Sequence, residues 1–94
     1  MRLVGREVLD RFCSKHADCR KWVGVWVADV TTSHWRVPQD IKTRYASASF
    51  LAHNVVIFNV RGNEYRLVTR VAYQTRIVIA EWIGTHAEYM KKYC

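Results

Sequence analysis

Residues 54–89 constrain the fold of this chain more than any other segment, because strand-forming runs alternate there with turn residues. Three runs rich in Val, Ile, Phe, Tyr and Trp are separated by short polar breaks, which is typical of an antiparallel meander. Gly62 and Asn63 suit a two-residue hairpin turn between the first two runs, because both residues tolerate positive φ. The segment therefore predicts two consecutive β-hairpins that lead into a short C-terminal helix.

The turn at Gly62 and Asn63 fixes a register for the first hairpin, in which Asn59 lies opposite Arg66. Side chains alternate between the two faces of a strand, so this register also assigns each residue to a face. One face is mixed and carries Asn59, Arg66 and Arg70 among Val55, Ile57 and Val68. The other face is apolar and is expected to form the core with Val56, Phe58, Val60, Tyr65, Leu67, Val71 and Tyr73.

A second turn is expected at residues 74–75, where Gln and Thr form a weaker turn pair. Glu81 then falls on the face of the two arginines of the preceding strand, so a structural salt bridge is an alternative role for them. In this register the opposed pairs are Arg66 with Ile83 and Arg70 with Ile79.

The last strand is expected to end at Gly84, and residues Thr85–Glu88 then match the S/T-x-x-E capping box of a helix. This box gives Glu88 a complete structural role. His86 falls at the first helical position, next to unpaired backbone N–H groups that favour a phosphate. This helix start comes just beyond the strand end that holds Asn59 and Arg66. The candidate site is therefore the polar cluster of Asn59, Arg66 and His86.

The 94 residues are half hydrophobic, which is typical of a single globular domain covering residues 1–94. The chain has no unbroken apolar run of about 18 residues, and its N-terminus lacks the apolar segment of a signal peptide. We therefore expect a cytoplasmic protein that does not bind a membrane.

The charge is strongly positive, since 15 Lys and Arg against eight Asp and Glu give +7. Arginines predominate among these cations, and Arg is the better bidentate ligand of phosphate. Such a charge favours a polyanionic partner, either nucleic acid or an acidic protein that covers the same surface. The alternative is a basic protein with no such partner.

The first half of the chain predicts helices that cover the apolar face of the sheet. Trp22 and Trp26 lie one helical turn apart, where two tryptophans are more often core than binding surface. Asp18 is the expected N-cap of their helix. Met1–Gly5 predicts an edge strand, and Ala46–Asn54 a loop with room for another. The expected helices span Arg6–His16, Asp18–Thr32 and Pro38–Tyr45.

Cys13, His16 and Cys19 raise the alternative of a metal site, because their types suit zinc. A helix places Cys13 and His16 on one face, but Cys19 lies beyond a helix break at Asp18, and a fourth ligand would have to come from far away. We therefore expect half-buried thiols and no metal. With Cys94 the chain has three cysteines, an odd number that argues against a disulfide framework.

Three motifs in a fixed order carry a resemblance to a known family. They are Trp35-x-x-Pro38-x-Asp40-Ile41-Lys42, the strand–turn–strand segment 56–68, and the segment 83–89, Ile-Gly-Thr-His-Ala-Glu-Tyr. Over essentially its whole length the chain resembles the HigB family of bacterial toxins, in the RelE/ParE superfamily. The resemblance implies an α+β, RelE-like fold, with two to three helices packed on one face of a twisted antiparallel sheet and a short C-terminal helix.

The resemblance also implies the toxin component of a type II toxin–antitoxin system. HigB-like toxins resemble RelE in being endoribonucleases, or mRNA interferases, which cleave mRNA by attack of the 2′-hydroxyl, usually on the ribosome and without a metal or cofactor. The implied protein partner is a HigA-like antitoxin with a helix-turn-helix fold. Carried over by position, the implied catalytic residues are Arg66, His86 and Tyr89, and the implied RNA-binding residues are Lys42, Arg44, Asn59 and Arg70.

Two other classes of function stay open, and the base that removes the 2′-hydroxyl proton is not assigned. Met90 stands where the family commonly has Asp, and residues 55–60 carry none of the lysines of RelE itself. A ParE-like protein would share the fold but poison DNA gyrase through protein contact. A non-catalytic module would bind RNA or the ribosome with the same basic face and cut nothing.

Overall fold

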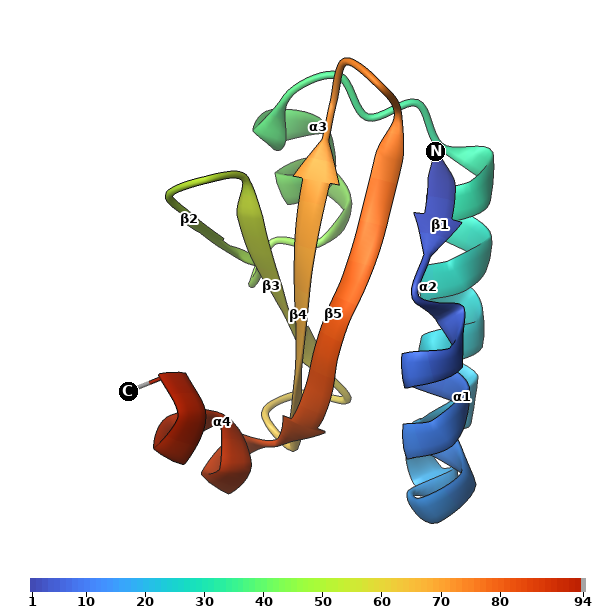
Figure 1. The fold of residues 1–94 in the computed structure, drawn as a ribbon, viewed down its shortest axis with the longest axis vertical. Helices are drawn as coiled ribbons and strands as arrows, with labels where there is room; N and C mark the ends of the chain where they lie inside the picture. Colours follow the sequence, from blue (N-terminus) through green and yellow to red (C-terminus); the bar gives the residue numbers. More distant parts are fainter. Residues whose placement is uncertain (94) are drawn as a thin grey trace.

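A five-stranded mixed sheet lies at the centre of the computed structural model, which describes residues 1–93 (Figure 1). Across the sheet the strands follow the order β1-β5-β4-β3-β2. The predicted meander is confirmed as β3–β4–β5, and the two short strands form the edges. In chain order the strands are β1 (Arg2–Val4), β2 (Ser49–Leu51), β3 (Val55–Val60), β4 (Tyr65–Ala72) and β5 (Ile77–Thr85).

The sequence predicts an antiparallel sheet, and this prediction is wrong at one edge. There, β1 pairs with β5 in parallel. Arg2 lies beside Ile77, and Val4 lies beside Ile79. No hairpin joins these two strands, and a strand of three residues carries no pattern that encodes its direction. Parallel neighbours need a long crossover, which the helices between β1 and β5 provide.

The helices lie on both sides of the sheet. In Figure 1, α1 and α2 run along one side, while α4 follows the end of β5 on the other side. The predicted core is confirmed, since Phe58, Leu67 and Val71 are almost fully buried in one apolar cluster with residues of α1 and α2. The helices are α1 (Arg6–Lys15), the 3₁₀ turn η1 (Ala17–Cys19), α2 (Arg20–Thr32), α3 (Pro38–Arg44) and α4 (His86–Tyr93).

The sequence predicts that Asp18 caps α2, and this prediction is wrong. The carboxylate of Asp18 instead binds residues from another part of the chain. α2 begins at Arg20 without a side-chain cap. Asp18 lies in η1, where it accepts a hydrogen bond of 2.8 Å from the Tyr65 hydroxyl and pairs with Arg61 at 2.9 Å. These contacts fasten η1 to the turn between β3 and β4.

The turn between β3 and β4 spans residues 61–64 and keeps the predicted register. Positive φ occurs at Arg61 (54°) and Gly62 (71°), one residue earlier than the sequence predicts. Asn59 lies opposite Arg66, as predicted. The hairpin therefore sets the polar face of the sheet correctly although its turn differs in detail.

Candidate functional site

Arg66 is the second residue of β4 and lies half-buried on the sheet face opposite α1 and α2. Its partners in the sheet are Asn59 on β3 and Gly84 on β5. Its Nη1 donates a hydrogen bond of 3.2 Å to the carbonyl of Tyr65. Within residues 1–93 no carboxylate forms an ion pair with this guanidinium, so its planar fork is available to bind an anion.

A β-bulge in β5 changes the predicted register beside Arg66. Arg70 lies opposite Ile79, as predicted, but Arg66 lies opposite Gly84 and not Ile83. The register shifts because β5 contains one extra residue at this point. As a result a glycine, and not a bulky aliphatic side chain, flanks the arginine.

Gly84 leaves room for an aromatic ring next to Arg66. A Cβ built on Gly84 would lie 2.4 Å from both Cη2 and Cζ2 of Trp82. The indole ring therefore fills the space that any side chain at position 84 would take. Since Gly84 and Arg66 are direct cross-strand partners, their side-chain positions share one face, and the ring lies beside the arginine.

Trp82 also anchors α4, the helix that carries His86 and Tyr89. Its ring centroid lies 6.4 Å from that of Tyr89 and 5.6 Å from that of Tyr93, and the two tyrosines stack at 5.2 Å. No residue of α4 is fully buried, so these aromatic contacts hold the helix on the sheet. Tyr89 therefore has a packing role in addition to the catalytic role that the sequence predicts for it.

The start of α4 is fixed by the predicted capping box. The Glu88 N–H donates to Thr85 Oγ1 at 3.1 Å, and the Thr85 N–H donates to Glu88 Oε1 at 2.8 Å. The hydrogen bond from the Thr85 backbone, helped by the Thr85 side chain, lowers the pKa of Glu88. A carboxylate held in this way is a poor general base, which agrees with the structural role expected for Glu88.

His86 is the exposed first residue of α4, where the β4–β5 ladder ends. Its N–H donates to the carbonyl of Glu64 at 3.0 Å, which ties the helix start to the β3–β4 turn. Only Thr85 separates it from the glycine that pairs with Arg66. The backbones of Asn59, Arg66 and His86 therefore meet at one end of the sheet.

The loop before β2 connects Lys42 with Asn59, and the sequence predicts that both residues bind RNA. Lys42 Nζ donates to the carbonyl of Ala48 at 3.0 Å, and Asn59 Nδ2 donates to the carbonyl of Ser47 at 3.4 Å. Lys42 and Asn59 thus contact neighbouring residues of one loop, from α3 and from β3.

The other two residues that the sequence predicts to bind RNA, Arg70 and Arg44, lie on opposite sides of the sheet. Arg70 shares the face of Arg66 but pairs with Glu81 at 3.5 Å, the structural alternative noted from the sequence. Arg44 lies on the helical side, where it pairs with Asp29 of α2 at 3.0 Å. It does not join the polar end of the sheet, because the last turn of α3 faces α2.

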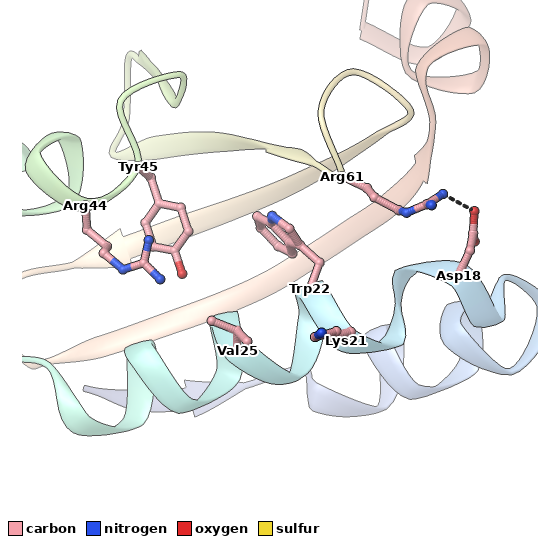
Figure 2. A pocket seen from close by; sticks show the side chains of 7 residues that line it. All are labelled: Asp18, Lys21, Trp22, Val25, Arg44, Tyr45 and Arg61. Atoms are coloured by element: carbon pink, nitrogen blue, oxygen red, sulfur yellow. Dashed lines mark hydrogen bonds and ion pairs between the residues drawn. The ribbon is translucent and has the colours of Figure 1, made fainter.

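A pocket of about 530 Å³ lies on the helical side (Figure 2). Trp22 stands in its middle, with Arg44 near one end and the Arg61–Asp18 ion pair at the other. The sequence does not predict it, because Trp22 carries the same helical signal as the fully buried Trp26. Its lining residues are Asp18, Lys21, Trp22, Val25, Arg44, Tyr45 and Arg61.

A family model described as HigB_toxin, the RelE-like toxic component of a toxin–antitoxin system, matches residues 19–92. This range covers well over half of the chain and includes all the motifs that carry the resemblance. The chain belongs to the HigB family of RelE-like toxins. The comparison with curated proteins gave no match.

Membership of the HigB family defines the general role of the chain as the toxin of a toxin–antitoxin system, with an antitoxin as its partner. The matched range starts within η1, so β1 and α1 lie outside it. Within residues 1–93, no helix is long and apolar enough to cross a membrane. In the same part of the chain, no three His, Cys, Asp or Glu side chains are grouped so that they could hold a metal ion.

Proposed function

We propose that this HigB-family chain is an endoribonuclease that cleaves mRNA on the ribosome without a metal ion. The supporting observation is Arg66, a half-buried cation without a carboxylate partner in residues 1–93, at the sheet end shared by Asn59 and His86. A guanidinium that folding holds on an open face without an internal counter-ion suits a phosphate.

The proposed reaction begins when a base removes the proton of an RNA 2′-hydroxyl and the 2′-oxygen attacks the adjacent phosphorus. The resulting phosphorane carries added negative charge on its non-bridging oxygens, and Arg66 binds two of them through its fork. The bond from phosphorus to the 5′-oxygen then breaks, and an acid protonates the leaving oxygen. The products are a 2′,3′-cyclic phosphate and a 5′-hydroxyl end.

We assign proton transfer to His86, because imidazole is the side chain that titrates closest to neutral pH. The backbone N–H groups at the start of α4 add a second attraction for the phosphate. Tyr89 lies one turn further along α4 and offers a ring for base stacking and a hydroxyl for proton transfer. Lys42, Asn59 and Arg70 are assigned to flanking phosphates, whereas Arg44 is not, since it pairs with Asp29 on the helical side.

The proposed protein partner is a HigA-like antitoxin with a helix-turn-helix domain. We expect an acidic segment of this antitoxin to cover Arg66, Arg70 and Lys42, so that it competes with mRNA. The dissociation constant of the complex should then rise steeply with NaCl concentration, because the contacts are ionic. A dissociation constant that does not change with NaCl concentration, together with loss of binding in Trp22→Ala, would instead locate the antitoxin at the pocket of Figure 2.

The test of the catalytic proposal is cleavage of a translated message on purified ribosomes, followed by mapping of the new 3′ ends. His86→Gln keeps size and hydrogen bonding but removes proton transfer, and it should lower the rate by on the order of 10²–10⁴-fold. Arg66→Lys should also be strongly impaired, because an ammonium lacks the bidentate fork. His34→Gln and Arg76→Lys are matched controls, since both residues are exposed beside the β4–β5 turn at the other end of the sheet.

The controls should cut at the wild-type rate. Wild-type rates in both His86→Gln and Arg66→Lys would contradict the assignment of residues. Intact mRNA together with arrest of DNA gyrase would favour the ParE-like alternative. Binding to the ribosome without any cleavage would favour the non-catalytic module.

A further inference from the structure

We propose that Cys13 and Cys19 form an intramolecular disulfide when the protein meets a peroxide or a small-molecule disulfide. Their Sγ atoms lie 3.3 Å apart, and both side chains are buried. A disulfide bond is about 2.05 Å long, so the sulfurs need to approach by only about 1.3 Å. This site lies on the helical side and does not depend on the reaction proposed for the polar face.

Local contacts hold the two sulfurs in this position. Cys13 lies in α1 and Cys19 ends η1, so the chain turns back between them. The Cys19 thiol donates to the carbonyl of His16 at 3.1 Å, and Arg20 Nε donates to the carbonyl of Cys13 at 3.1 Å. Folding therefore places in contact two cysteines that the sequence gives no reason to pair.

His16 does not complete a metal site with these cysteines. Its ring stacks on Phe12, with centroids 4.2 Å apart, and meets the edge of Tyr65 at 5.5 Å. The histidine of the sequence motif is thus part of an aromatic cluster. What remains of the motif is a pair of adjacent thiols, and the chemistry of such a pair is two-electron oxidation.

Cys13 is the thiol that a small oxidant reaches first. It lines a surface pocket of about 230 Å³ between α1 and α2, whereas Cys19 is fully buried. Arg6, Asp10 and Arg20 line the same pocket, so a small polar oxidant meets polar side chains on its way to Cys13. Burial, followed by the contact with Cys13, raises the pKa of Cys19 to about 12, so Cys19 is suited to react second.

The chemistry with hydrogen peroxide runs in two steps. The Cys13 thiolate attacks one peroxide oxygen, and the O–O bond breaks. Hydroxide departs, and Cys13 becomes a sulfenic acid. Cys19 then gives its proton to hydroxide and its sulfur attacks the Cys13 sulfur, which breaks the S–O bond and releases a second hydroxide. That hydroxide takes up the proton lost by Cys13, so two thiols and one peroxide give one disulfide and two waters. Two electrons pass from sulfur to oxygen.

The disulfide would stabilise η1, the element that contacts the β3–β4 turn. It joins α1 to η1, and η1 carries Asp18, whose carboxylate holds Tyr65 and Arg61. Closing this short loop restricts the unfolded chain, and the oxidised protein should melt on the order of 5 °C higher than the reduced protein.

The test uses the full chain with Cys94→Ser, which leaves Cys13 and Cys19 as its only thiols. After treatment with millimolar hydrogen peroxide, the intact mass should fall by about 2 Da, and dithiothreitol should restore it. Peptide mapping should find Cys13 linked to Cys19. A gain of about 16 or 32 Da without the loss, or two thiols that still alkylate after unfolding, would overturn the proposal.

Two variants in the same background test the order of attack. Cys19→Ser should accumulate a sulfenic acid at Cys13 that dimedone traps, and Cys13→Ser should be trapped about tenfold more slowly at Cys19. Equal trapping in both variants would overturn the role of Cys13 as the first thiol. If either variant fails to fold, the mass measurement on the Cys94→Ser protein still decides whether the disulfide forms.

Discussion

At Gly84 a single hydrogen atom determines where the ring of Trp82 lies and what surrounds Arg66. A Cβ at this position would lie 2.4 Å from two ring atoms, so Gly84→Ala must displace the indole. We expect the free energy of unfolding to fall by about 1–3 kcal/mol, as in other overpacked sites. Urea unfolding followed by tryptophan fluorescence measures both the loss and the new environment of the ring.

Gly24→Ala is the matched control for this substitution. Gly24 is exposed in α2, and nothing lies within 4 Å of a Cβ built on it. Alanine favours a helix over glycine, so this variant should be unchanged or more stable by up to about 1 kcal/mol. A similar loss of stability in both variants would show that the Gly84 result does not come from Trp82.

Asp18 controls the ionisation of Tyr65. The hydrogen bond to Asp18, followed by burial, raises the pKa of Tyr65 from 10 to about 12. The folded state therefore holds this proton more tightly, and the resulting stability is complete below pH 10 and is lost as the pH rises through 12. Asp18→Asn should bring the pKa back toward 10, and tyrosinate absorbance should show one tyrosine titrating earlier. Asp10→Asn, an exposed change outside this contact, should leave the titration unchanged.

At the level of elements, the sequence predicted those features that depend on neighbouring residues. The β3–β4 hairpin is one, because the turn and the alternation of side chains lie within one short segment and fix Asn59 opposite Arg66. The capping box of α4 is another, since Thr85 and Glu88 bind one another across a single helical turn.

Features that depend on distant contacts were not predictable in this way. The parallel direction of β1 is set by its place beside β5, and the bulge that brings Gly84 to Arg66 has no turn or spacing signal of its own. Asp18 has the sequence of an N-cap but binds Tyr65 across the fold. For the same reason Arg44 could be recognised as a basic residue but not as the partner of Asp29.

Loss of the capping box should destabilise α4 more than the rest of the fold. Thr85→Ala removes the acceptor of the Glu88 N–H and should cost about 1 kcal/mol. Faster amide hydrogen exchange in residues 86–93, with little change in β3 and β4, would be the expected result. Because the pKa of Glu88 is lowered, the contribution of its carboxylate is present above pH 4.5 and is lost as the pH falls through the folded value.

Thr32→Ala, at the end of α2, is the control for this prediction. It removes a threonine hydroxyl that donates to the carbonyl of Ala28 at 2.7 Å, away from α4. Exchange in residues 86–93 should therefore match the wild type. If Thr85→Ala behaves in the same way, the contacts of Trp82 with Tyr89 and Tyr93 hold α4 without help from the cap.

At the scale of the whole molecule, the net charge of +7 means that cations outnumber carboxylates, so ion pairs neutralise some arginines and not others. On the helical side, Arg44 pairs with Asp29 and Arg61 pairs with Asp18. On the polar face Arg70 pairs with Glu81, whereas Arg66 has no such partner within residues 1–93. Within this part of the chain, Arg66 therefore contributes an unpaired positive charge at the end of the sheet where the candidate site lies.

The unpaired charge of Arg66 predicts how the binding of a short single-stranded RNA depends on salt. Each phosphate contact contributes about −0.7 to the slope of log K against log salt concentration. Arg66→Gln and Lys42→Gln should each make the slope shallower by about 0.7, as measured by fluorescence anisotropy over a series of NaCl concentrations. Arg44→Gln is the matched control, because it removes the same charge from the helical side, where Asp29 already balances it. A slope that changes with Arg44 but not with Arg66 would mean that RNA binds over the helices and not over the polar face.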